Sequence, residues 1–312
     1  FYHSEITDPV EGEYHGYELL SVPPPSRGGV ALIEALNLFE QTGATGFGIG
    51  DPRSIHLMSQ CLQQAYADAR FLVCDQSFIR TDWKRMLTHQ HAALAAEGIS
   101  LDARAGVALP VGHPDRDDHG NTTHLVVVDR WGNVVSLTQS INYFFGAGVM
   151  AGNTGLLLNN QMADFNLPPT DDASPIPLDT LNYIRGRKRP RSNMTPLIML
   201  RDGKPVLAIG TPGGSRIVAA VAQIVVDIID FDLDISGAID YPRFFPVMNH
   251  LVIENRVDKK LLKRLRKDGY QLHLAGPYST YFGGAHGIAL PPLCRQICGA
   301  ADKRRGGQAQ GY

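Results

Sequence analysis

Apolar residues recur every three or four positions in several stretches of the chain, which is the spacing of one buried helix face. The longest such stretch runs from Pro52 to Arg70, and Asp51 directly before it is a suitable N-cap. The stretch from Lys259 to Lys267 is basic with leucines along one side, which predicts a surface helix. The predicted helices cover residues 30–40, 52–70, 83–97, 217–229 and 259–267.

The pattern changes to strand-like runs at Thr122. Leu125–Val128 and Val134–Leu137 are short apolar runs joined by a polar turn, which predicts a hairpin. Because Leu125–Val128 is apolar on both faces, we expect it in a sheet that is covered on both sides. Further strands are predicted at residues 155–159 and 205–210. Paired strands between helices indicate an α+β domain of three or four layers.

Two long stretches lack any such periodicity. Residues 98–121 contain the polar run His113–Gly120, which is typical of an exposed loop that is easily cut. Residues 166–187 are rich in proline and aspartate and are long enough to form a lid over a site.

Composition and charge exclude several classes of protein. The 312 residues are 44% hydrophobic and 19% charged, which is enough to bury a sizeable core. Lysine and arginine number 29 against 31 acidic residues, so no overall basic field favours nucleic acid as a partner. The longest apolar stretch, Ile217–Ile229, is interrupted by Gln223 and Asp227 and falls short of the roughly 20 residues of a membrane helix.

The four cysteines are Cys61, Cys74, Cys294 and Cys298. Their spacing matches neither a paired CxxC metal motif nor a dense disulfide framework, so we expect buried or idle thiols. The sequence contains no cluster with metal-ligand spacing, and no basic stretch followed by an apolar run opens the chain at Phe1.

The junction Asn121-Thr122-Thr123-His124 joins a predicted loop to a predicted strand. An internal threonine is a poor nucleophile, but a threonine made N-terminal by cleavage carries its own α-amine as an adjacent base. A chain that used Thr122 in this way would have to cut itself, its hydroxyl attacking the preceding carbonyl. Two threonines at a strand start are equally explained by β-propensity, and His124 is either a base or a packed side chain.

A second candidate is the turn Pro212-Gly213-Gly214-Ser215 between a predicted strand and a predicted helix. Paired glycines allow backbone N–H groups to point together beside a helix N-terminus, which is a suitable oxyanion hole. The alternative is a tight turn with Ser215 as N-cap.

Two further polar groups have both a binding and a structural interpretation. The basic run Arg185–Arg191 is either an anion site or a solvated loop. A polar group near the hairpin can orient a zwitterionic ligand, because its aspartate can pair with the ligand's ammonium while the amides hydrogen-bond it. The alternative is an ordinary asparagine-rich turn at a strand end. This group comprises Ser140, Asn142, Asn159, Asn160, Gln161 and Asp164.

The order and spacing of these pieces resemble the γ-glutamyltranspeptidase family, a branch of the N-terminal nucleophile hydrolases. The stretches that carry the resemblance are Thr122–His124 with Asp129–Ser136, Leu157–Phe165, Lys188–Met194 and Pro212–Ser215. In addition, Pro23–Gly29 is similar to part of the family's large subunit and Gly311-Tyr312 to its usual end.

The resemblance implies an αββα four-layer sandwich and self-cleavage between Asn121 and Thr122. Residues 1–121 would then be the C-terminal part of a large subunit, and residues 122–312 the small catalytic subunit. In that family the freed threonine attacks the γ-glutamyl amide of glutathione and related compounds. The acyl-enzyme then passes its acyl group to water or to an amino acid.

The resemblance also implies roles for individual residues. Thr122 would be the nucleophile, its α-amine the general base, and Ser140 a hydroxyl that supports it. Gly213 and Gly214 would donate N–H groups to the oxyanion. The substrate's α-amino group would be held by Asn142, Gln161 and Asp164, and its α-carboxylate by Ser192 and Asn193. The family needs neither a metal nor an organic cofactor, and it implies a periplasmic or extracellular location.

Two departures from the family pattern leave the acyl group open. Asn193 stands where a second serine is common, and Ala163 replaces the first acid of an Asp-Asp pair. The alternatives are an acylase of the same fold, acting on a glutaryl-type cephalosporin side chain or on poly-γ-glutamate, and a non-catalytic, truncated member.

Overall fold

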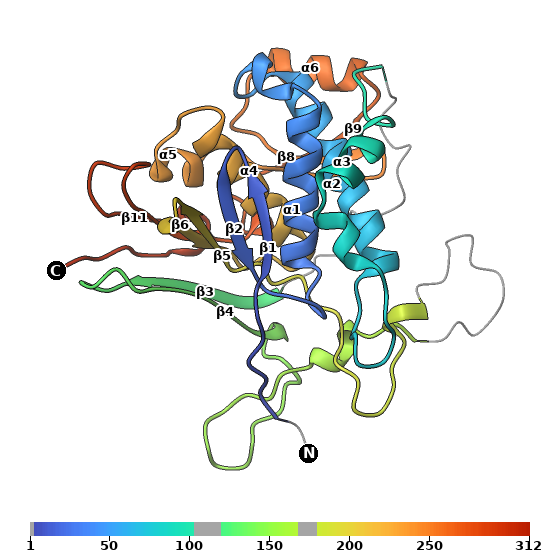
Figure 1. Cartoon of the computed structure of the whole chain (residues 1–312), viewed down its shortest axis with the longest axis vertical. Helices are drawn as coiled ribbons and strands as arrows, with labels where there is room; N and C mark the ends of the chain where they lie inside the picture. Colours follow the sequence, from blue (N-terminus) through green and yellow to red (C-terminus); the bar gives the residue numbers. More distant parts are fainter. Residues whose placement is uncertain (1–2, 103–119, 168–179) are drawn as a thin grey trace.

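The computed structural model describes residues 3–102, 120–167 and 180–312, so the predicted loop 113–119 and most of the predicted lid lie outside the described residues (Figure 1). The α-helices are α1 (Gly28–Gln41), α2 (Pro52–Leu72), α3 (His89–Ala96), α4 (Ile217–Ile229), α5 (Ile235–Asp240) and α6 (Lys259–Lys267). The strands are β1 (Val10–Tyr14), β2 (Tyr17–Ser21), β3 (Gly120–Val128), β4 (Val134–Tyr143), β5 (Leu197–Arg201), β6 (Lys204–Gly210), β7 (Phe244–Val247), β8 (His250–Glu254), β9 (Gln271–Ala275), β10 (His286–Ala289) and β11 (Cys298–Ala301).

A six-stranded antiparallel sheet, in the order β1-β2-β5-β6-β10-β11, forms the centre of the molecule. Helices α1, α4 and α5 lie against one face of it. The hairpin β3–β4 lies against the other face, where β3 contacts β6 and β10 (Figure 1). The order of layers is therefore helices, main sheet and hairpin.

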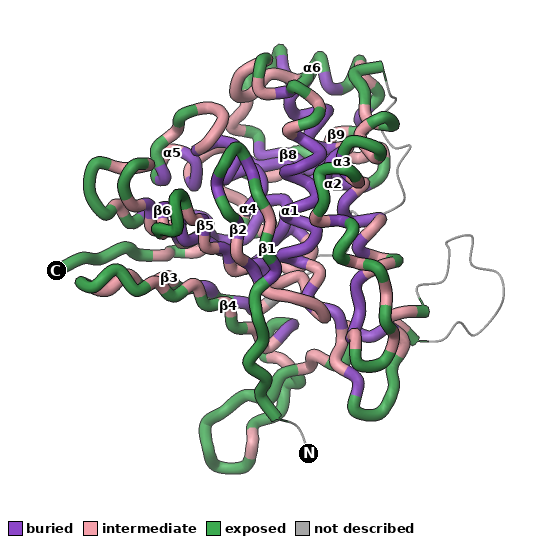
Figure 2. The backbone as a smooth tube through the Cα atoms, in the orientation of Figure 1, coloured by how far each residue is buried: buried purple, intermediate pink, exposed green. Residues whose placement is uncertain are grey.

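The core lies between the helices and the main sheet. Figure 2 shows buried positions running along α1, α2 and α4, and α4 is buried over nearly its whole length. Because α4 is apolar except at Gln223 and Asp227, it suits this central position rather than the surface. Within the described residues, no helix combines the length and the apolar character needed to cross a membrane.

A smaller three-stranded sheet, β7-β8-β9, extends the molecule beside α2 and α6. Leu261, Leu262 and Leu265 of α6 are buried against it, while the lysines and arginines between them face solvent. The predicted amphipathic surface helix is thus confirmed.

The remaining helix predictions are confirmed with one exception. The helix expected from Pro52 is α2, and the Asp51 carboxylate caps it by accepting from the Arg53 N–H at 2.8 Å. The single helix expected over 83–97 is wrong, because Thr88 is extended and separates a 3-10 turn from α3. The Thr88 hydroxyl instead caps α3, accepting from the His91 N–H at 3.2 Å.

Two strand predictions need correction. The hairpin is present, but β3 begins at Gly120 rather than at Thr122. The strand expected at 155–159 does not form: in that range only Leu157 makes an isolated bridge, to Met150. The strand expected at 205–210 is confirmed as β6.

The expectation that Leu125–Val128 is covered on both sides is also wrong for the described residues. Leu125 and Val127 are 43% and 50% exposed, and their cross-strand partners Leu137 and Val135 are 44% and 51% exposed. The alternate positions of β3 face the main sheet, as the period of two requires. The hairpin pairs with no third strand in the described part of the chain, so one apolar face of it is open (Figure 2).

We predict that replacing this outward leucine pair by threonine, in the variant Leu125→Thr/Leu137→Thr, lowers the binding of an apolar fluorescent dye to the folded chain. The free energy of unfolding should change by only about 0.5 kcal/mol per site, because both side chains are already solvated. The matched control is Leu207→Thr in the buried part of β6. It should lower the free energy of unfolding several-fold more. Unchanged dye binding, or unfolding of the double variant, would contradict the exposed face.

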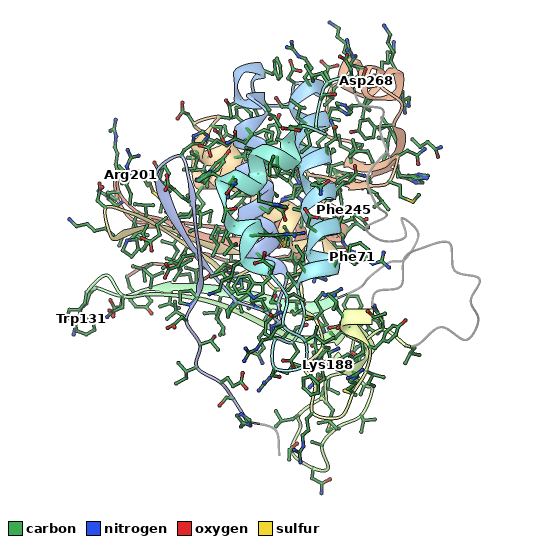
Figure 3. All side chains as sticks on the ribbon, turned by 45° about the vertical axis from the view of Figure 1, so that its right-hand side comes forward. Phe71, Trp131, Lys188, Arg201, Phe245 and Asp268 are labelled. Atoms are coloured by element: carbon green, nitrogen blue, oxygen red, sulfur yellow. A yellow bond between two sulfur atoms is a disulfide. The ribbon has the colours of Figure 1, made fainter. Side chains whose placement is uncertain are left out.

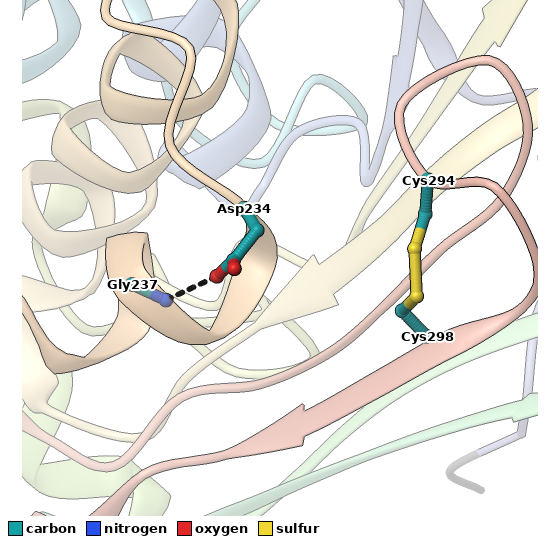
Figure 4. Close-up of a disulfide and its surroundings, with 4 residues drawn as sticks. All are labelled: Asp234, Gly237, Cys294 and Cys298. Carbon is teal, nitrogen blue, oxygen red and sulfur yellow. Dashed lines mark hydrogen bonds between the residues drawn. A yellow bond between two sulfur atoms is a disulfide. The ribbon is translucent and has the colours of Figure 1, made fainter.

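The expectation of idle thiols is wrong for two of the four cysteines. Cys294 and Cys298 form a disulfide that closes a short loop leading into β11 (Figure 4). The same view shows the nearby start of α5, where the Asp234 carboxylate accepts from the Gly237 N–H at 2.7 Å. Cys61 and Cys74 are buried free thiols, as expected.

We predict that the denatured chain presents two thiols to an alkylating reagent before reduction and four after it. Mass analysis of the labelled peptides should place the first two labels on Cys61 and Cys74. The variant Cys294→Ser/Cys298→Ser is the control and should show two labels in both states. Four labels on the unreduced wild type would refute the disulfide.

Candidate functional site

Thr122 lies on the inner face of the hairpin and is 8% exposed. Ser140 is its cross-strand partner in β4, and the two hydroxyl oxygens are 2.9 Å apart. This pairing follows from the antiparallel register, which places opposite residues on the same face of the sheet. The structure therefore brings the expected nucleophile and its expected supporting hydroxyl into direct contact.

The bond expected to be cut lies at an irregularity of β3. The register of the hairpin shifts between Gly120 and Thr122, so Asn121 has no cross-strand partner. Such a bulge bends the strand locally and is common beside active sites. The Asn121–Thr122 peptide bond is thus held at the distorted end of an otherwise regular ladder.

Ser140 connects Thr122 to the polar group at the end of β4. Its hydroxyl oxygen accepts from the Asn142 N–H at 2.9 Å. Asn142 has a positive φ of 72°, which asparagine tolerates better than most residues, and its side chain donates to the Asn160 carbonyl at 3.3 Å. The turn at the end of β4 therefore brings Asn142 beside the 159–161 segment.

Gln161 and Asp164 lie on one 3-10 turn, and the Gln161 side-chain N–H donates to the Asp164 carboxylate. The Asp164 main-chain carbonyl accepts from the Asn182 side chain at 2.6 Å. Asn182 in turn accepts from the Arg191 N–H at 3.0 Å, next to Ser192. Hydrogen bonds thus connect the two groups of residues expected to hold opposite ends of a substrate.

Ser192 and Asn193 lie directly against the start of α1. The Ser192 carbonyl accepts from the Arg27 N–H at 2.9 Å, and residues 26 and 192 form an isolated bridge. The Asn193 side-chain oxygen accepts from Arg27 Nε at 2.5 Å. The expected carboxylate site therefore includes an arginine that sequence reasoning did not single out.

The glycine turn leads from β6 into α4. Gly213 and Gly214 have φ of 146° and 58°, conformations that favour glycine over residues with a side chain. Gly214 is the first residue of a 3-10 turn, where the N–H has no intrahelical partner. The N-cap residues of this 3-10 turn and of α4 are Gly213 and Arg216, and neither end has a side-chain cap. The alternative interpretation of Ser215 as N-cap is therefore wrong.

His124 packs the hairpin onto the end of β6. A Cβ at Gly210 would lie 2.3 Å from Cε1 of the imidazole, so position 210 must be glycine for this approach. The ring is 3% exposed and its Nδ1 lies 2.8 Å from the Thr138 hydroxyl. Burial, with a smaller effect from His286, lowers the pKa of His124 to about 3, so it is a neutral packed side chain.

The basic run is solvated in its first half, where Arg185 and Arg187 are exposed, and structural from Lys188 onward. The Lys188 ammonium donates to the carbonyls of Leu181 and Tyr183 at 2.6 and 3.0 Å. Arg191 is 8% exposed and its guanidinium donates to the carbonyls of Val73 and Arg70. In Figure 3, Trp131 marks the tip of the hairpin, and Lys188 lies near the hairpin's other end. Lys188 and Arg191 hold the segment expected to bind substrate in place.

Three potential metal ligands meet away from this site, although the sequence shows no ligand motif. Glu34, Asp68 and His91 come from α1, α2 and α3. His91 Nε2 lies 2.9 Å from a Glu34 carboxylate oxygen and 3.3 Å from one of Asp68. Burial raises the pKa of Glu34. His91 contacts one oxygen of each carboxylate, and among the described residues Glu34 Oε2 is buried without a hydrogen-bond partner.

A small apolar cavity lies between α2, α4 and the three-stranded sheet. It is lined by side chains that include Met58, Val226, Asp227 and Tyr241, and by none of the expected site residues. It therefore has no part in the chemistry considered below.

The structure adds residues to the site that the sequence did not indicate. Arg27 and Asn182 contact the expected binding residues, and the Tyr66 hydroxyl donates to the Ser215 carbonyl beside the glycine turn. Arg27 belongs to the stretch 23–29 already noted for its resemblance, which was the only available signal. No pattern in the sequence indicated the contacts of Asn182 and Tyr66.

The fold is that of the N-terminal nucleophile hydrolases. The chain aligns with a cephalosporin acylase from Bacillus halodurans over 100% of its own length and 55% of that chain, with a TM-score of 0.82 at 23% identity, which shows the fold alone. A mutant of Helicobacter pylori gamma-glutamyltranspeptidase aligns over 59% of this chain and 100% of its own, with a TM-score of 0.52 at 35% identity. The expected α+β fold of the N-terminal nucleophile hydrolase type is thereby confirmed. The described residues supply its helix layer, main sheet and hairpin.

The chain belongs to the gamma-glutamyltranspeptidase family, whose model matches residues 1–312. A glutathione hydrolase proenzyme of Escherichia coli is 33% identical over 95% of this chain and 51% of its own length. An acylase proenzyme of a Pseudomonas species is 32% identical over 96% of this chain and 52% of its own length. The chain spans about half the length of the curated relatives it matches.

We predict that the buried neutral imidazole makes stability depend on pH below about 6.5. The pKa of His124 is lower in the folded state than in the unfolded state. Its contribution to the free energy of unfolding is therefore complete above the pKa of the unfolded state and falls as the pH drops toward 3. The slope should reach about 1.4 kcal/mol per pH unit for this one group. Denaturant titrations at several pH values measure it.

The variant His124→Gln should reduce that slope even if it lowers stability at neutral pH. The exposed His89 provides the matched control, since His89→Gln should leave the pH slope of the wild type in place. Equal slopes for wild type and His124→Gln would refute the assignment.

Proposed function

We propose that the chain carries the catalytic half of a self-processing enzyme that cleaves the γ-glutamyl amide of glutathione and related compounds. The observation that supports this most directly is the contact of Thr122 with Ser140, at 2.9 Å, next to a bulged strand end. Family membership and relatives named glutathione hydrolase proenzymes support the same conclusion.

Processing would begin at the bulge. The Thr122 hydroxyl oxygen attacks the Asn121 carbonyl carbon, and the Thr122 nitrogen leaves, which turns the amide into an ester. Water then hydrolyses the ester, leaving a carboxylate on Asn121 and a free α-amine on Thr122. Residues 1–121 and 122–312 would become separate subunits of one precursor.

The reaction would use the amine that processing releases. The α-amine takes the hydroxyl proton as the Thr122 oxygen attacks the γ-carbonyl carbon of the substrate. The N–H groups of Gly213 and Gly214 hydrogen-bond the oxyanion. The leaving amine then takes the proton, and water or an amino acid releases the acyl group from the threonine ester. No step requires a metal or organic cofactor.

The substrate's two charged groups would be held by different segments. The Asp164 carboxylate pairs with the α-ammonium, and Gln161 and Asn142 hydrogen-bond the same end. Ser192 and Asn193 hold the α-carboxylate. This division agrees with the two groups of site residues, which hydrogen bonds connect through Asn182.

A second candidate is an acylase of the same fold. The likeness to an acylase proenzyme and to the fold of a cephalosporin acylase favours it, and it uses the same nucleophile on a glutaryl-type acyl group. Comparing hydrolysis of a γ-glutamyl anilide with that of a glutaryl anilide separates the two, because only the first carries an ammonium group for Asp164. A third candidate is an enzyme of the same fold that processes poly-γ-glutamate.

We also propose a periplasmic or extracellular location. The bond between Cys294 and Cys298 supports it, because disulfides persist mainly in oxidising compartments.

The proposal predicts that purified wild-type chain, analysed by intact mass under denaturing conditions, yields a fragment that comprises residues 122–312. Thr122→Ala should yield none and should lose release of p-nitroaniline from its γ-glutamyl anilide by about a thousandfold or more. Thr122→Ser keeps a hydroxyl and should still be cut.

Three results would tell against different parts of the proposal. Cutting of Thr122→Ala at the same bond would exclude self-cleavage by that hydroxyl. An intact, inactive wild type would favour a non-catalytic member of the family. Cutting without anilide release would direct attention to another acyl group.

A further inference from the structure

The side chains of Glu34, Asp68 and His91 meet at one point, although they come from three different helices, α1, α2 and α3. One ligand atom of each residue lies within 4.8 Å of the other two. The imidazole Nε2 of His91 is 2.9 Å from a Glu34 oxygen and 3.3 Å from an Asp68 oxygen. The ligand atoms of a tetrahedral zinc ion lie about 3.3 Å apart, because each bond is about 2.0–2.1 Å long. The two distances from the imidazole are therefore close to the edges of such a site.

Hydrogen bonds within the cluster leave part of it unsatisfied. His91 Nε2 carries at most one hydrogen, so it can donate fully to only one of the two carboxylates that it contacts. Glu34 is fully buried, and its second oxygen, Oε2, has no hydrogen-bond partner among the described residues. A buried carboxylate oxygen without a partner is costly, because nothing replaces the water that it has lost. A cation at this point can bind both oxygens of the carboxylate and so supply the missing contact.

The charges of the cluster also call for a cation. Burial, and next the neighbouring Asp68 carboxylate, raise the pKa of Glu34, with a smaller opposing effect from Arg85. Two carboxylates in contact repel each other when both are charged. A divalent cation between them removes this repulsion and keeps both groups in the charged form that binds metals.

The cluster has a buried end and an accessible end. Glu34 is fully buried, whereas the side chains of Asp68 and His91 are partly exposed, so an ion can enter from solvent. The Gln64 side chain donates to the Asp68 carboxylate at 2.9 Å, as the outer partners of metal ligands commonly do. Each of the three ligands stands on a helix, which holds a side chain more precisely than a loop does.

We propose that Glu34, Asp68 and His91 bind a divalent transition-metal ion, with zinc as the preferred one. One imidazole nitrogen and two carboxylate oxygens form a donor set that suits zinc, and water would take the fourth position. The ion would tie α3 to α1 and α2. Within α3 only Ala92 is buried, so this helix has little apolar contact of its own. None of the three ligands belongs to the expected acyl-transfer site, so the role of the ion is structural and the inference is independent of the proposed function.

The first test is calorimetric titration of zinc chloride into purified chain that a chelator has freed of metal. Wild type should bind one zinc ion at this site, and His91→Gln should bind it at least about a hundredfold more weakly, because it lacks a ligand. Gln64→Ala removes only the outer partner and should weaken binding about tenfold. Zinc at about a hundred times Kd should raise the Tm of wild type by several degrees and leave the Tm of His91→Gln unchanged.

Cobalt(II) reports which kinds of atom bind the ion. In wild type its visible spectrum should show the bands of a site with nitrogen and oxygen ligands, without the charge-transfer band of a bound thiolate. A thiolate band would place the ion on Cys61 or Cys74, the free cysteines, and would refute the proposed ligands.

The exposed pair His250 and His273 provides the matched control. Its ring nitrogens Nδ1 and Nε2 are 2.9 Å apart, so it offers zinc an alternative site. His250→Gln/His273→Gln should keep Kd within about twofold and should keep the rise in Tm.

Three outcomes would overturn the assignment: a wild type that binds no zinc, equal binding by wild type and His91→Gln, and loss of binding in the histidine-pair control. Circular dichroism of the metal-free proteins is the folding control. Asp68→Asn provides a second ligand variant that keeps the size of the side chain, and it should weaken zinc binding by the same margin as His91→Gln.

Discussion

The contact between the buried imidazole of His124 and the bare backbone of Gly210 holds the hairpin on the main sheet. Because side chains alternate along a strand, fixing His124 inward also fixes Thr122 inward, two residues away. The antiparallel register then places Ser140 opposite Thr122. A side chain at position 210 would displace the ring and with it the strand that carries Thr122, so the geometry of the site depends on this one close approach.

The site is assembled from segments far apart in the chain, and its charges are separated accordingly. Arg27 brings a cation to the Ser192–Asn193 segment, while Asp164 brings an anion to the turn after β4. Asn182 joins the two segments by hydrogen bonds, and the buried arginine and lysine of the basic run fix their backbones. The zwitterionic acyl group of the proposed substrate would meet an opposite charge at each of these segments.

Local signals in the sequence predicted local structure well. Asp51 marked the start of α2, and leucines at helical spacing marked the buried side of α6. Errors arose where another part of the molecule decides the outcome. An apolar run such as Leu125–Val128 is compatible with a covered sheet, yet coverage depends on residues elsewhere. The family motifs predicted Thr122 and Ser140 as a pair, but the contact of Arg27 with Asn193 joins residues far apart in sequence and could not be inferred from spacing.

The central claim is that the Thr122 oxygen carries the acyl group during turnover. The most direct measurement is a rapid acid quench during hydrolysis of γ-glutamyl-p-nitroanilide, followed by mass analysis of the fragment that begins at Thr122. The account predicts that this fragment gains the mass of one γ-glutamyl group and that fragmentation places it on Thr122. Hydrolysis with the acyl group found on another residue would contradict the account.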